Sequence, residues 1–94
     1  MTNPVLVARQ VTVHGRVQGV FFRDNCRREA EDRGVGGWIQ NLDDGTVLAA
    51  FEGSPANVES MVSWAHNGSR HAVVERVDVV DVELTGLTEF RLRG

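Results

Sequence analysis

The spacing of apolar residues along this chain changes several times, and this change most restricts the possible fold. From Val7 to Val13 apolar side chains fall mostly on alternate positions, as in a half-buried strand. Phe22, Cys26 and Ala30 then recur at intervals of four, as on one face of a helix, and Gly34 follows as a typical C-terminal cap. A strand followed by an amphipathic helix is therefore predicted for the first third of the chain.

The next segment predicts two strands joined by a tight turn. Gly37 to Leu42 and Thr46 to Phe51 are the two strands, and Asp43-Asp44-Gly45 lies between them. Asp-Gly tolerates the positive φ angles that hairpin turns require. We therefore expect an antiparallel hairpin here.

A second helix is predicted after this hairpin. Serine caps free helix amides and proline suits the first helical position, so Ser54-Pro55 is a strong start signal. Asn67-Gly68 is the expected end. The apolar stripe of this helix consists of Val58, Met61, Val62 and Ala65.

The remaining chain returns to strand from Val73 to Leu84, and a last short segment, Thr88 to Arg93, has Phe90 and Leu92 on one side. The order strand, helix, strand, strand, helix, strand is the split βαβ arrangement. It predicts an α+β fold with both helices on one face of the sheet and the other face partly open. With 94 residues and 41% hydrophobic content, one domain spanning residues 1–94 is expected.

Charge and composition exclude several classes of function. The net charge of −3 argues against standing affinity for nucleic acid or anionic membranes, so any anion site must be small and local. All basic residues are arginine, which excludes a Schiff-base lysine and a Walker-type phosphate lysine in this chain. Cys26 is the only cysteine and is expected to be a small buried side chain. The three histidines lack the spacing of a zinc site.

The N-terminus lacks the basic and apolar regions of a signal peptide, and no apolar run is long enough to span a membrane. We therefore expect a cytoplasmic protein without a membrane partner. Nothing in the sequence demands more than a monomer.

The loop from Gly15 to Gly19 is the first candidate site, because it connects a predicted strand to a predicted helix. Its amides and those of the first helical turn lack intrahelical partners, and an anion would satisfy them. The glycines permit a concave backbone, and Val20 and Phe21 would form its walls. The same spacing also occurs in tight connections that bind nothing, so both interpretations stay open.

Arg23 lies in the first turn of that helix, where the helix dipole disfavours a cation. Its side chain would lean back toward the loop, where the guanidinium could close on a phosphate. The alternative is a surface arginine paired with Asp24 or with an acid one turn further on. Asn41, just before the hairpin turn, either bonds within that turn or supplies an amide that holds an attacking water.

Three motifs together resemble the acylphosphatase family. Gly15-Arg-Val-Gln-Gly-Val-Phe-Phe-Arg23, Gly37-Trp-Ile-Gln-Asn41 and Asp44-Gly45-Thr-Val47 match G-x-V-Q-G-V-x-F-R, G-W-V-x-N and D-G-x-V. The resemblance implies a ferredoxin-like fold and hydrolysis of small acyl phosphates to carboxylate and inorganic phosphate, without metal or cofactor. It also implies that Arg23 binds the phosphoryl group, together with the amides of the loop Gly15, Arg16, Val17, Gln18, Gly19 and Val20, and that Asn41 orients the water.

One segment departs from the family pattern. Many members carry a glycine and one or two prolines after the second helix, whereas this chain has Gly68-Ser69-Arg70-His71. The rigidity of that connection is therefore in question.

Two alternatives of other kinds remain at this point. A binding module of this architecture would use aromatics on the open sheet face to hold RNA, but the chain lacks tyrosine, the RNA-binding aromatic signature and a basic charge. The chain could also resemble an acylphosphatase-like accessory domain of a carbamoyl-transfer enzyme. Its short length favours a stand-alone protein.

Overall fold

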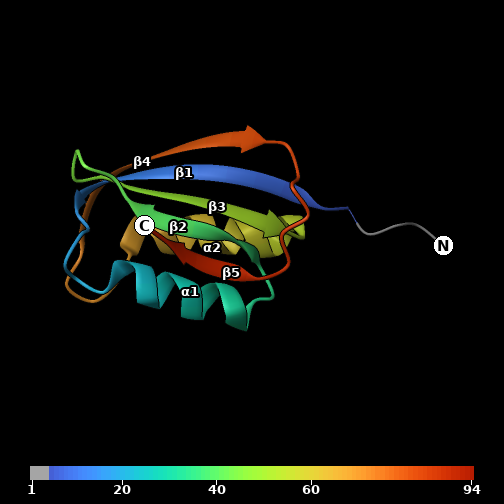
Figure 1. Ribbon diagram of the computed structural model, residues 1–94, viewed down its shortest axis with the longest axis horizontal. Helices are drawn as coiled ribbons and strands as arrows, with labels where there is room; N and C mark the ends of the chain where they lie inside the picture. Colours follow the sequence, from blue (N-terminus) through green and yellow to red (C-terminus); the bar gives the residue numbers. More distant parts are fainter. Residues whose placement is uncertain (1–4) are drawn as a thin grey trace.

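A computed structural model describes residues 5–94 and has two layers, a five-stranded sheet and two helices on one of its faces (Figure 1). The elements along the chain are β1 (Val7–Arg16), α1 (Phe22–Asp32), β2 (Gly36–Asn41), β3 (Val47–Gly53), α2 (Pro55–Asn67), β4 (Val73–Val82) and β5 (Phe90–Arg93). The strand order is β4-β1-β3-β2-β5, in which β5 pairs parallel to β2 and the other pairs are antiparallel. The predicted ferredoxin-like α+β fold with a mixed sheet is confirmed.

The helix boundaries follow the predicted signals. Ser54 caps α2, where its Oγ accepts a hydrogen bond from the amide of Asn57 at 3.3 Å, and Pro55 is the first helical residue. Gly68 ends this helix at a φ of 70°, and a Cβ there would lie 2.4 Å from a ring carbon of Phe22. Within residues 5–94, neither helix is long and apolar enough to cross a membrane.

β1 is longer than predicted. Periodicity places its end at Val13, but pairing with β4 continues through Gly15 and Arg16 after a register shift between His14 and Gly15. At Gly15, φ is 130° and a Cβ would lie 2.1 Å from the Val73 carbonyl oxygen, so only glycine allows this close approach. The connection to α1 therefore begins after Arg16.

The core lies between the sheet and the helices. The apolar stripe predicted for α2 is buried, as are the three predicted positions of α1. Cys26 is among them, as expected, and burial, with a smaller effect of Glu29, raises the pKa of its thiol. The thiol is therefore a packing group.

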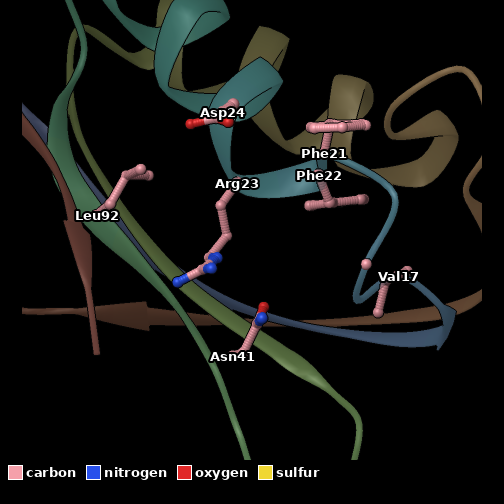
Figure 2. A pocket seen from close by; sticks show the side chains of 8 residues that line it. Val17, Phe21, Phe22, Arg23, Asp24, Asn41 and Leu92 are labelled. Atoms are coloured by element: carbon pink, nitrogen blue, oxygen red, sulfur yellow. The ribbon is translucent and has the colours of Figure 1, made fainter.

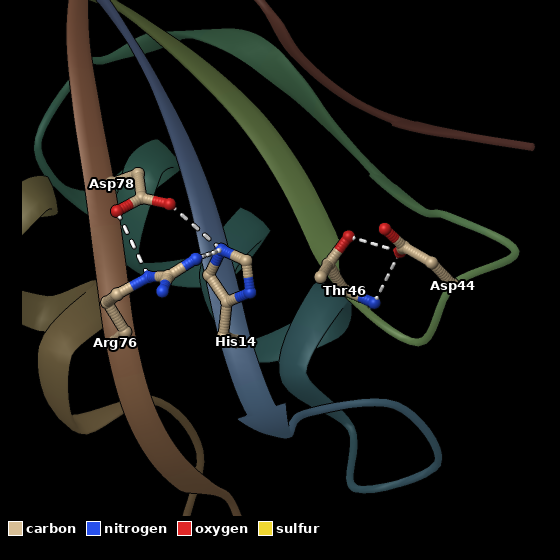
Figure 3. Close-up of polar contacts among 5 residues, drawn as sticks. All are labelled: His14, Asp44, Thr46, Arg76 and Asp78. Carbon is tan, nitrogen blue, oxygen red and sulfur yellow. Dashed lines mark hydrogen bonds and ion pairs between the residues drawn. The ribbon is translucent and has the colours of Figure 1, made fainter.

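The opposite face of the sheet is mostly polar. His14 of β1 contacts Asp78 and Arg76 of β4, at 2.9 and 3.1 Å, in the cluster that Figure 3 shows. On β2, the Trp38 ring lies under the guanidinium of Arg93 at 4.4 Å. This face has no row of exposed aromatics on the central strands within residues 5–94.

Glu52, at the end of β3, holds the connection between β4 and β5. Its buried carboxylate accepts hydrogen bonds from the amides of Thr85 and Gly86 at 2.8 and 3.1 Å and from the Thr85 hydroxyl. Burial alone raises the pKa of Glu52, but these hydrogen bonds outweigh it, so the pKa lies below its ordinary value of 4.5. The carboxylate thus positions the segment that leads into β5.

We expect Glu52→Gln to destabilise the fold at neutral pH by about 2 kcal/mol, because an amide presents one acceptor and one donor to groups that all donate. A folded-state pKa below the ordinary value means that the carboxylate stabilises the fold above pH 4.5 and loses this effect as the pH falls through the lowered pKa. The stability difference between wild type and variant, measured by urea unfolding, should therefore shrink in acid.

Glu83→Gln is the matched control, since Glu83 is an exposed carboxylate just after β4, at the start of the connection that Glu52 holds. It should change the free energy of unfolding by less than about 0.5 kcal/mol. A Glu52→Gln variant as stable as this control at neutral pH would contradict the role of Glu52.

Candidate active site

A cavity of about 280 Å³ lies where the β1–α1 loop, the start of α1, the end of β2 and β5 meet. Arg23 from α1 and Asn41 from β2 both line it, and Figure 2 shows their side chains pointing toward one another. Val17 and Gly19 line it from the loop. The structure therefore brings the predicted arginine, the predicted asparagine and part of the predicted loop to one cavity.

Arg23 is the second residue of α1, and its guanidinium reaches the end of β5. Nη1 donates to the carbonyl oxygen of Arg93 at 3.4 Å, which is a long hydrogen bond. Within residues 5–94 no carboxylate lies within 4.0 Å of this guanidinium; Asp24 pairs instead with Arg27. Arg23 therefore does not form the surface ion pair that the alternative interpretation required, and it lines the cavity.

Asn41 is the last residue of β2. Its Oδ1 is buried and has no hydrogen-bond partner within residues 5–94. The hairpin turn is stabilised by Asp44, which accepts from the amide of Thr46 at 3.0 Å and from its hydroxyl at 2.6 Å (Figure 3). These bonds lower the pKa of Asp44, the hydroxyl bond most of all. The turn thus does not use the Asn41 oxygen, and the interpretation of Asn41 as a turn residue loses its basis.

Gln18 ties the loop to this hairpin. Its Nε2 donates to the carbonyl oxygens of Leu42 and Thr46, at 2.7 and 2.9 Å. Spacing suggested only a backbone role for this residue, because a sequence does not show which carbonyls a side-chain amide will reach. Gln18 fixes the loop beside Asn41.

Ser69 holds the other end of the loop. Its buried hydroxyl donates to the carbonyl oxygen of Val20 at 2.6 Å, and Val20 itself is buried. A proline at this position would have no side-chain donor. The departure noted in the sequence therefore gives this chain a direct bond between the α2–β4 connection and the loop, while Arg70 is exposed.

The other predicted loop residues lie outside the cavity lining. Gly15 and Arg16 belong to β1, where they pair with Val74 and Val73. The apolar residues of the cavity include Phe21 and Leu92, and Leu92 was not anticipated as a site residue. Only the folded chain brings β5 next to α1.

No metal site accompanies this cavity. Within the part of the chain that the structure describes, no three histidine, cysteine, aspartate or glutamate side chains gather in a way that could hold an ion. His14 lies in the cluster on the open sheet face.

Comparisons with known proteins agree on one family. The acylphosphatase family model matches residues 9–92. Curated acylphosphatases from Natronomonas pharaonis and Thermococcus kodakarensis are each 48% identical, over 93% and 94% of this chain and 95% and 97% of theirs. The crystal structure of acylphosphatase from Bacillus subtilis is 35% identical, covers 96% of this chain and 100% of that one, and superposes with a TM-score of 0.90.

A larger protein contains the same fold. Full-length HypF, in a phosphate- and nucleotide-bound crystal structure, aligns with a TM-score of 0.87 at 23% identity, and the match covers 99% of this chain but 12% of HypF. At this identity the likeness concerns the fold alone. The match of the family model and the identity to full-length curated relatives show that this chain belongs to the acylphosphatase family.

Proposed function

We propose that this protein hydrolyses the carboxyl-phosphate bond of small acyl phosphates, with Arg23 and the loop amides binding the phosphoryl group and Asn41 orienting the attacking water. One observation supports the proposal most strongly. Asn41, whose buried Oδ1 has no partner within residues 5–94, lines the same cavity as Arg23. A bound anion requires a cation, and a water beside that anion requires a neutral acceptor.

Binding of the phosphoryl group uses two kinds of donor. The first amides of α1 have no intrahelical partner, and the loop before them carries Gly19 at a φ of 74° next to the cavity. Arg23 adds a guanidinium, whose fork of donors suits phosphate oxygens. Because Gln18 and Ser69 hold the loop, these donors need little reorganisation when charge develops on the phosphoryl oxygens.

The leaving group requires no general acid. The carboxylate released from an acyl phosphate has a conjugate acid with a pKa of roughly 4, so it departs as an anion at neutral pH. Asp24 is the carboxylate that lines the cavity, and Figure 2 shows it on the helix side, away from Asn41. The mechanism gives it no proton to transfer.

The attacking water is positioned by Asn41. A water that donates a hydrogen bond to Oδ1 satisfies the buried oxygen and turns a lone pair toward the phosphorus atom. In-line attack then forms a bond from the water oxygen to phosphorus and breaks the bond to the carboxylate oxygen, while a phosphoryl oxygen takes the water proton. Positioning and charge stabilisation supply the catalysis, without metal or cofactor.

Hydrolysis of benzoyl phosphate in excess chelator tests the proposal directly. Wild type should be active, and Arg23→Ala should lose about three decades or more in kcat/KM together with inhibition by inorganic phosphate, because the main cation of the site is removed.

Arg28→Ala is the control for Arg23→Ala, because Arg28 is an exposed arginine on the same helix. It should leave kcat/KM and inhibition by inorganic phosphate unchanged. Folded wild-type protein without chelator-resistant activity would refute the proposal.

We expect Asn41→Ala to lower kcat much more than it weakens inhibition by inorganic phosphate. The amide holds the water and not the phosphoryl group, so its loss affects the transition state and leaves the anion donors in place. Steady-state kinetics with phosphate as a competitive inhibitor measure both quantities.

Gln40→Ala is the matched control, because Gln40 precedes Asn41 on β2 and its side chain lies on the open sheet face. Equal losses in kcat and in phosphate affinity for Asn41→Ala would assign Asn41 to anion binding and exclude the water role.

A further inference from the structure

Phe21 is an aromatic residue in a backbone conformation that L residues avoid. Its φ of 60° and ψ of 26° lie in the left-handed region, and it is the one residue other than glycine with positive φ within residues 5–94. Phe21 is 71% exposed, so burial does not offset the strain. As the N-cap of α1 it also makes no side-chain cap bond. Local folding thus offers no reason for a phenylalanine, and strained residues of this kind cluster at ligand sites.

Phe21 lines the same cavity as Arg23 and Asn41. Leu92 of β5, 37% exposed, also lines it, and Figure 2 shows Phe21 and Leu92 on different sides of Arg23. In the proposed function, Arg23 binds the phosphoryl group and Asn41 holds the water. Exposed apolar side chains beside them are therefore available to the remaining part of the substrate, its acyl group.

The charge at the cavity further restricts that acyl group. Asp24 lines the cavity with a carboxylate that is 50% exposed and pairs with Arg27 only at 3.9 Å, so it keeps negative charge at the cavity. The Arg23 cation is occupied by the phosphoryl group in the bound state. An acyl group that carries its own carboxylate would therefore meet a like charge, whereas an uncharged apolar one would meet Phe21 and Leu92.

We propose that Phe21, together with Leu92, contacts the acyl group, and that the site prefers acyl phosphates with an aromatic or bulky apolar acyl group over acetyl phosphate. The inference rests on the proposed function, because that function places the phosphoryl group at Arg23. Stacking on an aromatic ring and contact with a leucine favour a phenyl group over a methyl group by the area that each removes from water.

The affinities of benzoylphosphonate and acetylphosphonate, measured by titration calorimetry, test this contact. Their carbon–phosphorus bond is not hydrolysed, so binding is observed without turnover. Wild type should bind benzoylphosphonate more tightly than acetylphosphonate. Phe21→Gly should reduce the ratio of these two affinities about tenfold, which is the low end of the discrimination that an apolar group in an apolar pocket provides. Glycine accepts a φ of 60° without strain, so this variant should fold.

Leu84→Ala is the control, because Leu84 is 48% exposed in the connection after β4, outside this cavity. It should leave the preference unchanged. The affinity for inorganic phosphate is also measured in each variant, because it shows whether the loop still binds an anion.

An unchanged preference in Phe21→Gly would overturn the inference, and so would an equal loss of affinity for both phosphonates and for phosphate, which would mean that Phe21 only shapes the loop. The proposed function fails by a different result. If wild type binds the phosphonates but does not hydrolyse the acyl phosphates, catalysis is refuted, while the affinity ratio still decides whether Phe21 contacts the acyl group.

Discussion

Two hydrogen bonds from side chains to backbone carbonyls hold the loop between β1 and α1, and the site depends on them. Gln18 fixes the loop to the β2–β3 turn through Leu42 and Thr46, and the buried Ser69 hydroxyl fixes its far end at Val20. The loop is thereby fixed relative to Asn41, which ends β2, and to Arg23, which begins α1. A glycine-containing loop without such contacts would have to be ordered by the ligand, at a cost in binding free energy.

β5 completes the cavity from the other side. It pairs parallel to β2, which places the Arg93 carbonyl against Arg23 and Leu92 at the cavity. The carboxylate of Glu52 determines where the chain enters β5 by binding Thr85 and Gly86. A buried acid far along the sequence from the loop thus contributes to the position of the cavity wall. In our proposal this wall receives the acyl group, while the loop receives the phosphoryl group.

The element order was predictable from local patterns, because helix caps such as Ser54 and turn residues such as Gly45 act within a few positions. The convergence of Arg23 and Asn41 also followed from the motifs and the resemblance that they carry. The length of β1 was not predictable, because the pairing of Gly15 with β4 depends on a close backbone approach that only the folded sheet creates. The hydrogen bonds of Gln18 and Ser69 were not predictable for the same reason, because their partners lie between 24 and 49 residues away in the sequence.

The central claim is that a water held by Asn41 attacks phosphorus while Arg23 and the loop hold the phosphoryl oxygens. Hydrolysis of benzoyl phosphate by wild type in ¹⁸O-labelled water, with mass spectrometry of both products, tests it most directly. The account predicts one labelled oxygen in inorganic phosphate and none in benzoate. Label in benzoate would mean that water attacks the acyl carbon, and would contradict the arrangement proposed for this cavity.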